Sequence, residues 1–133
     1  MKKKAVELRV TYADTDAMGV VYHTNYIKWF EVGRTEYMRD LGVVYAELEK
    51  EGYYLPVTEV YCHYLSPARY DECIQVVTMI NFFRRASVRF DYEIYDASGA
   101  VMLAEGYTAH AFINREGKIV RAPKYVTEKI GTL

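Results

Sequence analysis

The sequence predicts an α+β domain in which a curved antiparallel β-sheet wraps around one long central α-helix. Two observations lead to this fold class. Apolar residues recur at helical spacing over one long stretch, residues 26–41. Beyond residue 55 the period changes to two, over four segments rich in Val, Ile, Tyr, Phe and Thr. Because no helical segment connects these four, they favour an antiparallel sheet packed on one helix.

The first elements are a short strand and the long helix. We expect the strand over Val6–Thr11, followed by a loop with two acids and a glycine. The helix follows because one face carries Tyr26, Phe30, Gly33, Tyr37 and Leu41. It is apolar over most of its circumference, so we expect other structure to surround it. Gly42 ends this helix, and a shorter one is expected over Val44–Glu51.

Four strands then complete the chain, over Leu55–Leu65, Cys73–Phe83, Ser87–Tyr95 and Ala100–Ile113. Turn-forming residues separate them at Asp96–Gly99 and follow them at Asn114–Gly117. Strands of this length curl around the helix. Such a sheet also leaves an unpaired edge, which predicts a homodimer with a continuous sheet.

Composition places the chain among compact cytoplasmic proteins. Its 133 residues suit a single domain over residues 1–133. A net charge of −1 at pH 7 excludes a globally basic nucleic-acid binder. Two cysteines are too few for a disulfide framework and favour a reduced, cytoplasmic setting. The basic start has no apolar run behind it, and no stretch approaches the roughly 20 apolar residues of a membrane span. We therefore expect neither a signal peptide nor membrane insertion.

The loop before the long helix contains the candidate chemistry. Asp14, Asp16 and Gly19 lie in it, and His23 comes just before the helix. The first turn of a helix has N–H groups without partners and a partial positive charge. A thioester carbonyl placed there would be polarised, and Asp16 could attack it or deprotonate a water. The alternatives are a turn or cap role for the acids and a capping or packing role for His23.

No metal site is predicted. The spacing of Asp14, Asp16 and Gly19 partly mimics a calcium loop. However, Met18 occupies a ligand position and Asn25 replaces the terminal Glu, so too few oxygen ligands are left. The three histidines and two cysteines show no zinc spacing. No metal or other cofactor is therefore expected.

The stretch from Tyr12 to Tyr26 reads Tyr-x-Asp-Thr-Asp-x-x-Gly-Val-Val-Tyr-His-x-x-Tyr. It resembles the signature of the 4-hydroxybenzoyl-CoA thioesterase family of hotdog-fold enzymes, above all the Tol–Pal-associated acyl-CoA thioesterase branch. The similarity continues through residues 67–71, residues 84–87 and the final strand. It implies a hotdog fold and an enzyme that hydrolyses short-to-medium-chain or aromatic acyl-CoA thioesters. The implied assembly is a dimer or a homotetramer, with coenzyme A as part of the substrate or an acyl carrier protein in its place.

The resemblance also implies roles for single residues. Asp16 takes the place of the catalytic carboxylate, His23 that of the residue whose backbone N–H polarises the carbonyl, and Tyr12 that of a pocket tyrosine. The implied substrate-binding positions are Gly19, Tyr22, Asn25, Arg84, Arg85 and Ser87, and the two arginines lie where the family meets the nucleotide of coenzyme A. Members specific for 4-hydroxybenzoyl-CoA carry an aromatic residue in place of the histidine, which argues against that substrate here.

Three alternatives stay open. Arg84 and Arg85 fit equally well the role of solvated arginines at the end of a strand, without a ligand. A non-catalytic module that binds acyl-CoA or acyl carrier protein would have the same fold, although simple binding needs neither Asp16 nor His23. The third alternative is hydratase chemistry on the same fold. Hydratases of this fold have their Asp and His closer together in sequence than Asp16 and His23 are, which argues against it.

Overall fold

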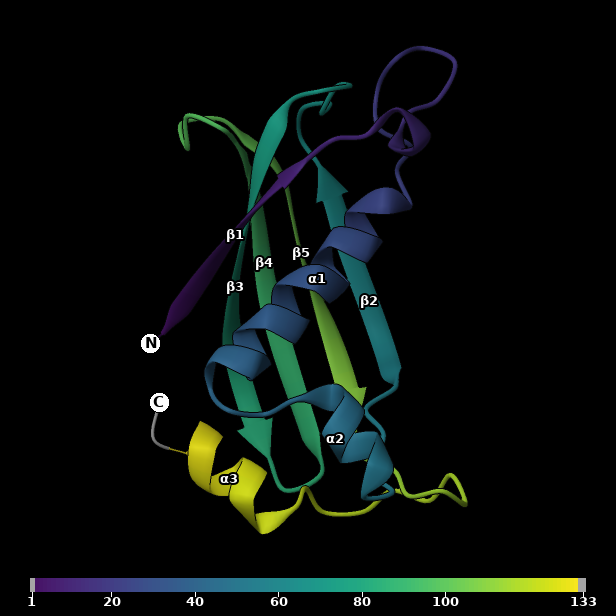
Figure 1. The fold of residues 1–133 in the computed structure, drawn as a ribbon, viewed down its shortest axis with the longest axis vertical. Helices are drawn as coiled ribbons and strands as arrows, with labels where there is room; N and C mark the ends of the chain where they lie inside the picture. The colour runs from purple at the N-terminus through teal and green to yellow at the C-terminus, as the bar shows by residue number, and fades with distance from the viewer. Residues whose placement is uncertain (1, 132–133) are drawn as a thin grey trace.

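The computed structural model describes residues 2–131, which form one five-stranded antiparallel sheet and three α-helices (Figure 1). The strands are β1 (Lys3–Arg9), β2 (Val57–Tyr64), β3 (Cys73–Arg84), β4 (Ser87–Asp96) and β5 (Met102–Ala111). The helices are α1 (Asn25–Asp40), α2 (Tyr45–Lys50) and α3 (Lys124–Ile130). The order across the sheet is β1-β3-β4-β5-β2, so β1 and β2 are the edges. Within the described residues, no helix is both long and apolar enough to cross a bilayer.

Helix α1 lies across one face of the sheet, and the core forms between the two (Figure 1). Side chains on β3 and β4 alternate between buried and less buried, so every second residue faces α1. Phe30 of α1 stacks on Tyr92 of β4 with 4.2 Å between ring centroids. Tyr37, about two turns further along α1, meets Phe90 edge-on. The predicted α+β class is confirmed, and the arrangement is the hotdog that the resemblance implies.

Helix α1 approaches the sheet most closely at Gly33. A Cβ atom built there would overlap Oγ1 of Thr78 and lie 2.9 Å from Cγ1 of Val76, both on β3. Both β3 residues are fully buried. Glycine at this position therefore lets the helix pack at its observed depth.

The bounds of the first and last strands differ from the predicted ones. The first strand runs over Lys3–Arg9 rather than Val6–Thr11, because all seven residues pair with β3 and Thr11 instead caps a 3-10 turn over Tyr12–Asp14. The last strand ends before Ile113, which bridges to Tyr54 instead.

Helix α3 is absent from the prediction. It follows Pro123, and it buries Val126 and Ile130 against the core. These two residues are four apart, which places them on one helix face. The seven residues contain only three apolar side chains, and two of these are adjacent, which is too weak a periodic signal to predict a helix.

Candidate active site

The loop between β1 and α1 folds back on itself as a small hairpin. Asp16 N donates to Val20 O at 2.9 Å, and Tyr22 N donates to Asp14 O at 2.9 Å. Gly19 lies at the turn with φ of 77°, a left-handed conformation that glycine adopts without strain. The hairpin therefore places the arm with the two acids beside the arm that leads into α1.

The two acids of this hairpin have different contacts. Asp14 Oδ2 accepts hydrogen bonds from the backbone N and Oγ1 of Thr11, each at 2.9 Å, so this carboxylate is a capping group. Asp16 is exposed, and its Oδ1 accepts from Met18 N at 2.8 Å. Its other carboxylate oxygen makes no hydrogen bond to any described residue. Each acid thus keeps one carboxylate oxygen without a hydrogen bond within residues 2–131, but Asp14 is partly buried and holds the cap, whereas Asp16 is exposed to substrate or water.

Backbone N–H groups are also free where α1 begins. The N–H groups of residues 25–27 each donate to the carbonyl three residues earlier, at 3.0 to 3.3 Å. The N–H groups of His23 and Thr24 have no acceptor within residues 2–131. They lie at the positive end of a helix of 16 residues, where a carbonyl oxygen would be polarised.

Asn25 ties the hairpin to this helix start. Its side chain is 8% exposed, and its Nδ2 donates to the backbone carbonyl of Asp14 at 2.8 Å. This predicted substrate-binding residue therefore holds the acid arm in place by a partly buried hydrogen bond.

A shallow pocket of about 300 Å³ opens beside His23, lined by Val21, His23, Tyr26, Tyr64, Leu65, Ser66 and Pro67. The hydroxyl of Tyr64, at the end of β2, donates to the His23 carbonyl at 2.8 Å. Burial, above all, raises the pKa of Tyr64 to about 12, so this donor keeps its proton at neutral pH. Tyr22 packs its ring on the His23 ring at 4.5 Å between centroids. The helix start is therefore held against the end of β2.

Tyr12 lies on the same loop but points outward. It is 78% exposed, and its ring meets Tyr70 edge-on at 5.7 Å. Six of the nine predicted site residues lie in the loop before α1 or at its first residue: Tyr12, Asp16, Gly19, Tyr22, His23 and Asn25.

The remaining three lie at the other end of the sheet. Arg84 ends β3, Ser87 begins β4, and the two pair across a tight hairpin. The acid-bearing loop meets the opposite end of β3, where Val10 N donates to Glu72 O. Because β3 has 12 residues, the two ends are roughly 36 Å apart at about 3.3 Å per residue (Figure 1). A single chain therefore does not bring the arginines to Asp16.

The arginine hairpin adjoins a basic pocket that the sequence analysis missed. The pocket has a volume of about 520 Å³, and its lining includes Arg85, Arg121 and Lys124. Ala122 N donates to Arg85 O at 2.9 Å, which attaches the C-terminal segment to the hairpin. The only local sign of this pocket in the sequence is Arg121 and Lys124, on either side of Pro123. Their distance in sequence from Arg85 hides the cluster.

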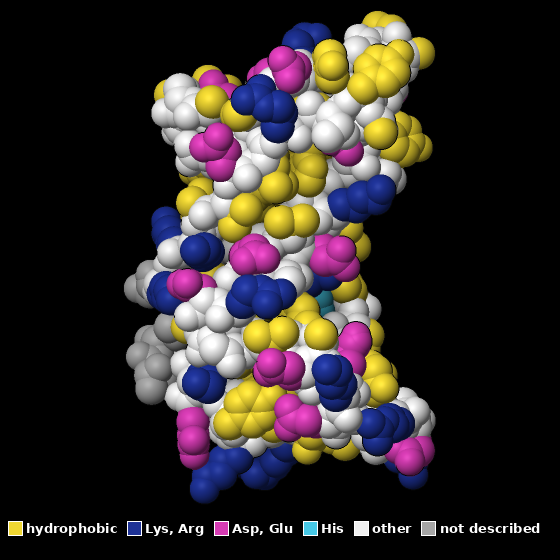
Figure 2. Space-filling model, in the orientation of Figure 1, with side chains coloured by type: hydrophobic (Ala, Val, Ile, Leu, Met, Phe, Trp, Pro, Cys, Tyr) yellow, Lys and Arg dark blue, Asp and Glu magenta, His cyan; other side chains and the backbone are white. Residues whose placement is uncertain are grey.

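A further cavity of about 420 Å³ lies between α1, α2 and the segment that precedes β2. We call it the α1–α2 cavity. Its lining includes Arg34, Tyr45, Leu48, Tyr53, Leu55 and Pro56. In Figure 2, the right-hand outline of the molecule curves inward at mid-height. The sequence analysis singled out none of these residues.

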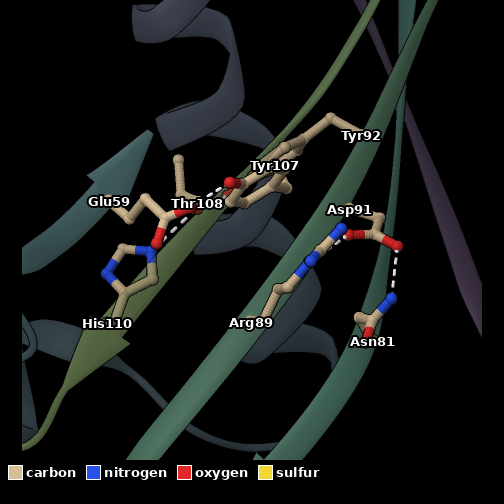
Figure 3. Close-up of polar contacts among 8 residues, drawn as sticks. All are labelled: Glu59, Asn81, Arg89, Asp91, Tyr92, Tyr107, Thr108 and His110. Carbon is tan, nitrogen blue, oxygen red and sulfur yellow. Dashed lines mark hydrogen bonds and ion pairs between the residues drawn. The ribbon is translucent and has the colours of Figure 1, made fainter. Parts of the chain in front are cut away.

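A buried chain of hydrogen bonds positions one wall of this cavity (Figure 3). The hydroxyls of Tyr92 and Thr108 are 2.6 Å apart, and Thr108 Oγ1 lies 2.8 Å from His110 Nε2. The other ring nitrogen, Nδ1, donates to the Leu55 carbonyl at 3.1 Å. Burial lowers the pKa of His110 to about 4, against an opposing effect of the Leu55 carbonyl. The ring is therefore neutral, and it anchors Leu55.

Comparison with known proteins places the chain in a family. Residues 10–130 match the model of the thioesterase-like superfamily. The chain belongs to this superfamily. The putative acyl-CoA thioesterase YneP of Bacillus subtilis is 37% identical over 116 residues, which cover 87% of this chain and 82% of that protein. The acyl-CoA thioester hydrolase YbgC of Escherichia coli O6:H1 is 35% identical over 95 residues, 71% of each chain.

A solved structure agrees with this assignment. The DHNA-CoA thioesterase from Staphylococcus aureus superimposes with a TM-score of 0.92 and is 34% identical, covering 100% of this chain and 93% of its own. The predicted family and hotdog fold are thereby confirmed. The predicted enzyme class, a thioester hydrolase, is confirmed by the named relatives.

Proposed function

We propose that this chain hydrolyses acyl-CoA thioesters, with Asp16 as general base or nucleophile and the His23 N–H as the donor that polarises the thioester carbonyl. The observation that carries the proposal is the pair of free N–H groups at the start of α1, next to a hairpin whose Asp16 carboxylate is exposed. An oxyanion donor is typically worth about 3–4 kcal/mol in the transition state. A positioned base adds roughly 10²–10⁴-fold.

In the base pathway, Asp16 takes a proton from a water whose oxygen attacks the thioester carbon. The carbonyl oxygen becomes an oxyanion and accepts a hydrogen bond from His23 N–H. Collapse of this intermediate breaks the carbon–sulfur bond, and the departing thiolate takes up the proton. In the nucleophile pathway, Asp16 attacks the carbon itself, and coenzyme A leaves as its thiolate when the carbon–sulfur bond breaks. Water then hydrolyses the resulting anhydride, which regenerates Asp16 and supplies the proton that the thiolate takes up. Both pathways yield the free acid and coenzyme A without a further cofactor.

The complete site is proposed to lie between two copies of the chain. Edge strand β2 exposes Val57, Val60, Tyr61 and Tyr64, which are 42% to 49% exposed. Edge strand β1 instead carries charged residues such as Lys3 and Arg9, which discourage pairing. A two-fold axis would therefore pair two β2 strands in antiparallel fashion.

This pairing supplies what one chain lacks. Strand β2 begins after Pro56, beside the α1–α2 cavity, and ends at Tyr64, beside His23. Antiparallel pairing therefore sets the His23 end of one copy next to the α1–α2 cavity of the other. It also brings the partner subunit's Arg84 and the partner subunit's Arg85 to that end. The acyl group would enter the partner's cavity, and the nucleotide phosphates would meet the arginines.

Coenzyme A is the proposed carrier because the basic pocket at the arginine hairpin suits its phosphates. An acyl carrier protein is the alternative. The free cysteines Cys62 and Cys73 fit the proposed cytoplasmic location.

Substitution of Asp16 tests the mechanism. Asp16→Asn should lower kcat at least about a hundredfold, because the amide can neither deprotonate water nor attack. The fold should persist, since the residue is exposed and an amide oxygen can still accept from Met18 N. The assay is release of free thiol from a panel of acyl-CoAs, with a circular dichroism melt to verify folding.

Asp14→Asn is the matched control, because asparagine keeps the capping role and activity should change little. Near-normal turnover by Asp16→Asn would remove Asp16 from the mechanism. Tight acyl-CoA binding without thiol release from the unmodified protein would instead identify a non-catalytic binding module.

A further inference from the structure

Arg34 and Tyr45 each carry a buried polar atom for which residues 2–131 provide no partner. Arg34 is 9% exposed, and its Nη1 makes no hydrogen bond. The Tyr45 hydroxyl is buried and likewise unpaired. Both residues line the α1–α2 cavity. Buried donors and charges without partners are costly, so their partner is expected to come from outside the chain.

The neighbours of Arg34 do not neutralise it. Its Nη2 lies 4.0 Å from Glu31 Oε1, and the Glu31 side chain is 69% exposed. Glu49 also lines the cavity and is exposed. Tyr45, Tyr92 and His110 feel the charge of Arg34, but burial raises the pKa of both tyrosines and lowers that of His110, so all three are neutral. The guanidinium is thus a poorly compensated buried cation.

We infer that Arg34 and Tyr45 bind the far end of the acyl group, and that this end carries a carboxylate. A guanidinium only donates hydrogen bonds, so its partner must be an acceptor, and its charge favours an anionic one. The remaining lining is largely apolar and includes Leu48, Leu55 and Pro56, which suits a carbon chain or ring. The substrate class is therefore an acyl-CoA whose acyl group ends in a carboxylate. This inference rests on the proposed function, which brings the thioester of one copy to this cavity of the other.

Matched pairs of substrates test the inference. We would compare hexanoyl-CoA with adipoyl-CoA, and benzoyl-CoA with 4-carboxybenzoyl-CoA. The carboxylated member of each pair should have a kcat/KM at least about tenfold higher, because only it satisfies the two buried donors.

Tyr45→Phe should bring this ratio toward one, since it removes only the unpaired hydroxyl. Folding should survive, because that hydroxyl makes no bond within the described chain. Tyr95→Phe is the matched control, because it removes a hydroxyl from the outward face of β4 and should leave the ratio unchanged.

The outcomes separate this inference from the proposed function. Hydrolysis of both members at equal kcat/KM would leave a thioesterase and overturn the carboxylate preference. A preference that Tyr45→Phe does not alter would also overturn it. If no ester is hydrolysed, the proposed function fails. Calorimetry with hexanoate then tests whether the α1–α2 cavity binds a carboxylate. Binding that Tyr45→Phe weakens would support a carboxylate site, and absence of binding would overturn it.

Discussion

Asp14 and Asp16 lie two residues apart, and their surroundings give them different contacts. Asp14 caps a 3-10 turn through two hydrogen bonds from Thr11. Asp16 forms one hydrogen bond with the backbone of its own turn and is otherwise exposed. Both therefore show the local roles that such residues commonly have in loops. Asp16 is the more exposed of the two, and it lies on the hairpin that leads to the free N–H groups at the start of α1.

His110 makes the stability of the fold depend on pH. Its pKa is about 4 in the folded protein, because burial disfavours the charged ring, against an ordinary value near 6.5. Between these values the unfolded chain binds a proton that the folded chain does not. The contribution of His110 is thus complete above about pH 6.5 and is lost as the pH falls through 4, by up to about 3 kcal/mol.

Urea denaturation at a series of pH values between 4 and 8 measures this loss. His110→Gln should be less stable at pH 7, since the contacts to Thr108 and Leu55 change. Its free energy of unfolding should also vary less with pH than that of the unmodified protein. An equally steep pH dependence in the variant would exclude His110 as the cause.

The helices and strands fit together because a few positions satisfy both the local preference of their element and its packing against another element. The helical and alternating periods identified α1 and the four later strands, since each element buries one face. The position of Gly33 is a tertiary requirement, because the helix crosses β3 there with no room for a side chain.

Gly33→Ala separates the two requirements. Helix propensity alone predicts that alanine stabilises the protein by about 1 kcal/mol. Overlap with Thr78, which is buried and β-branched and so cannot move far, should outweigh this and give a net loss of about 1–3 kcal/mol. Urea denaturation measures the sign, with Lys28→Ala at an exposed position of α1 as control. A more stable Gly33→Ala protein would show that the helix can move away from β3.

At the scale of the whole molecule, the candidate site is divided between two ends. The acid-bearing loop and the α1–α2 cavity adjoin opposite ends of β2, and the arginine hairpin lies with the cavity. Pairing of two β2 edges would reunite these parts in a dimer with two equivalent sites. Association of two such dimers into a tetramer stays a prediction.

Val60→Lys tests this assembly. A charge on the exposed β2 edge should convert a dimer of the 15.5 kDa chain into a monomer and abolish most thioesterase activity, because each site needs both copies. Sedimentation equilibrium at micromolar concentration measures the mass. Ala5→Lys on edge strand β1 is the matched control and should affect neither property. Full activity in a monomer would show that one chain suffices.

The sequence by itself determined the fold class, the order of the main elements and the loop that holds Asp16 and His23. These follow from periodicity and from a contiguous motif, which are properties of neighbouring residues. Only the tertiary structure decided that Arg84 and Arg85 lie far from Asp16 and that Arg121 and Lys124 join Arg85. It also decided that Arg34 and Tyr45, each with one buried polar atom unpaired within residues 2–131, line the same cavity. Those relations depend on which strands pair and where the helices dock. Long-range packing sets both, and no local pattern in the chain records it.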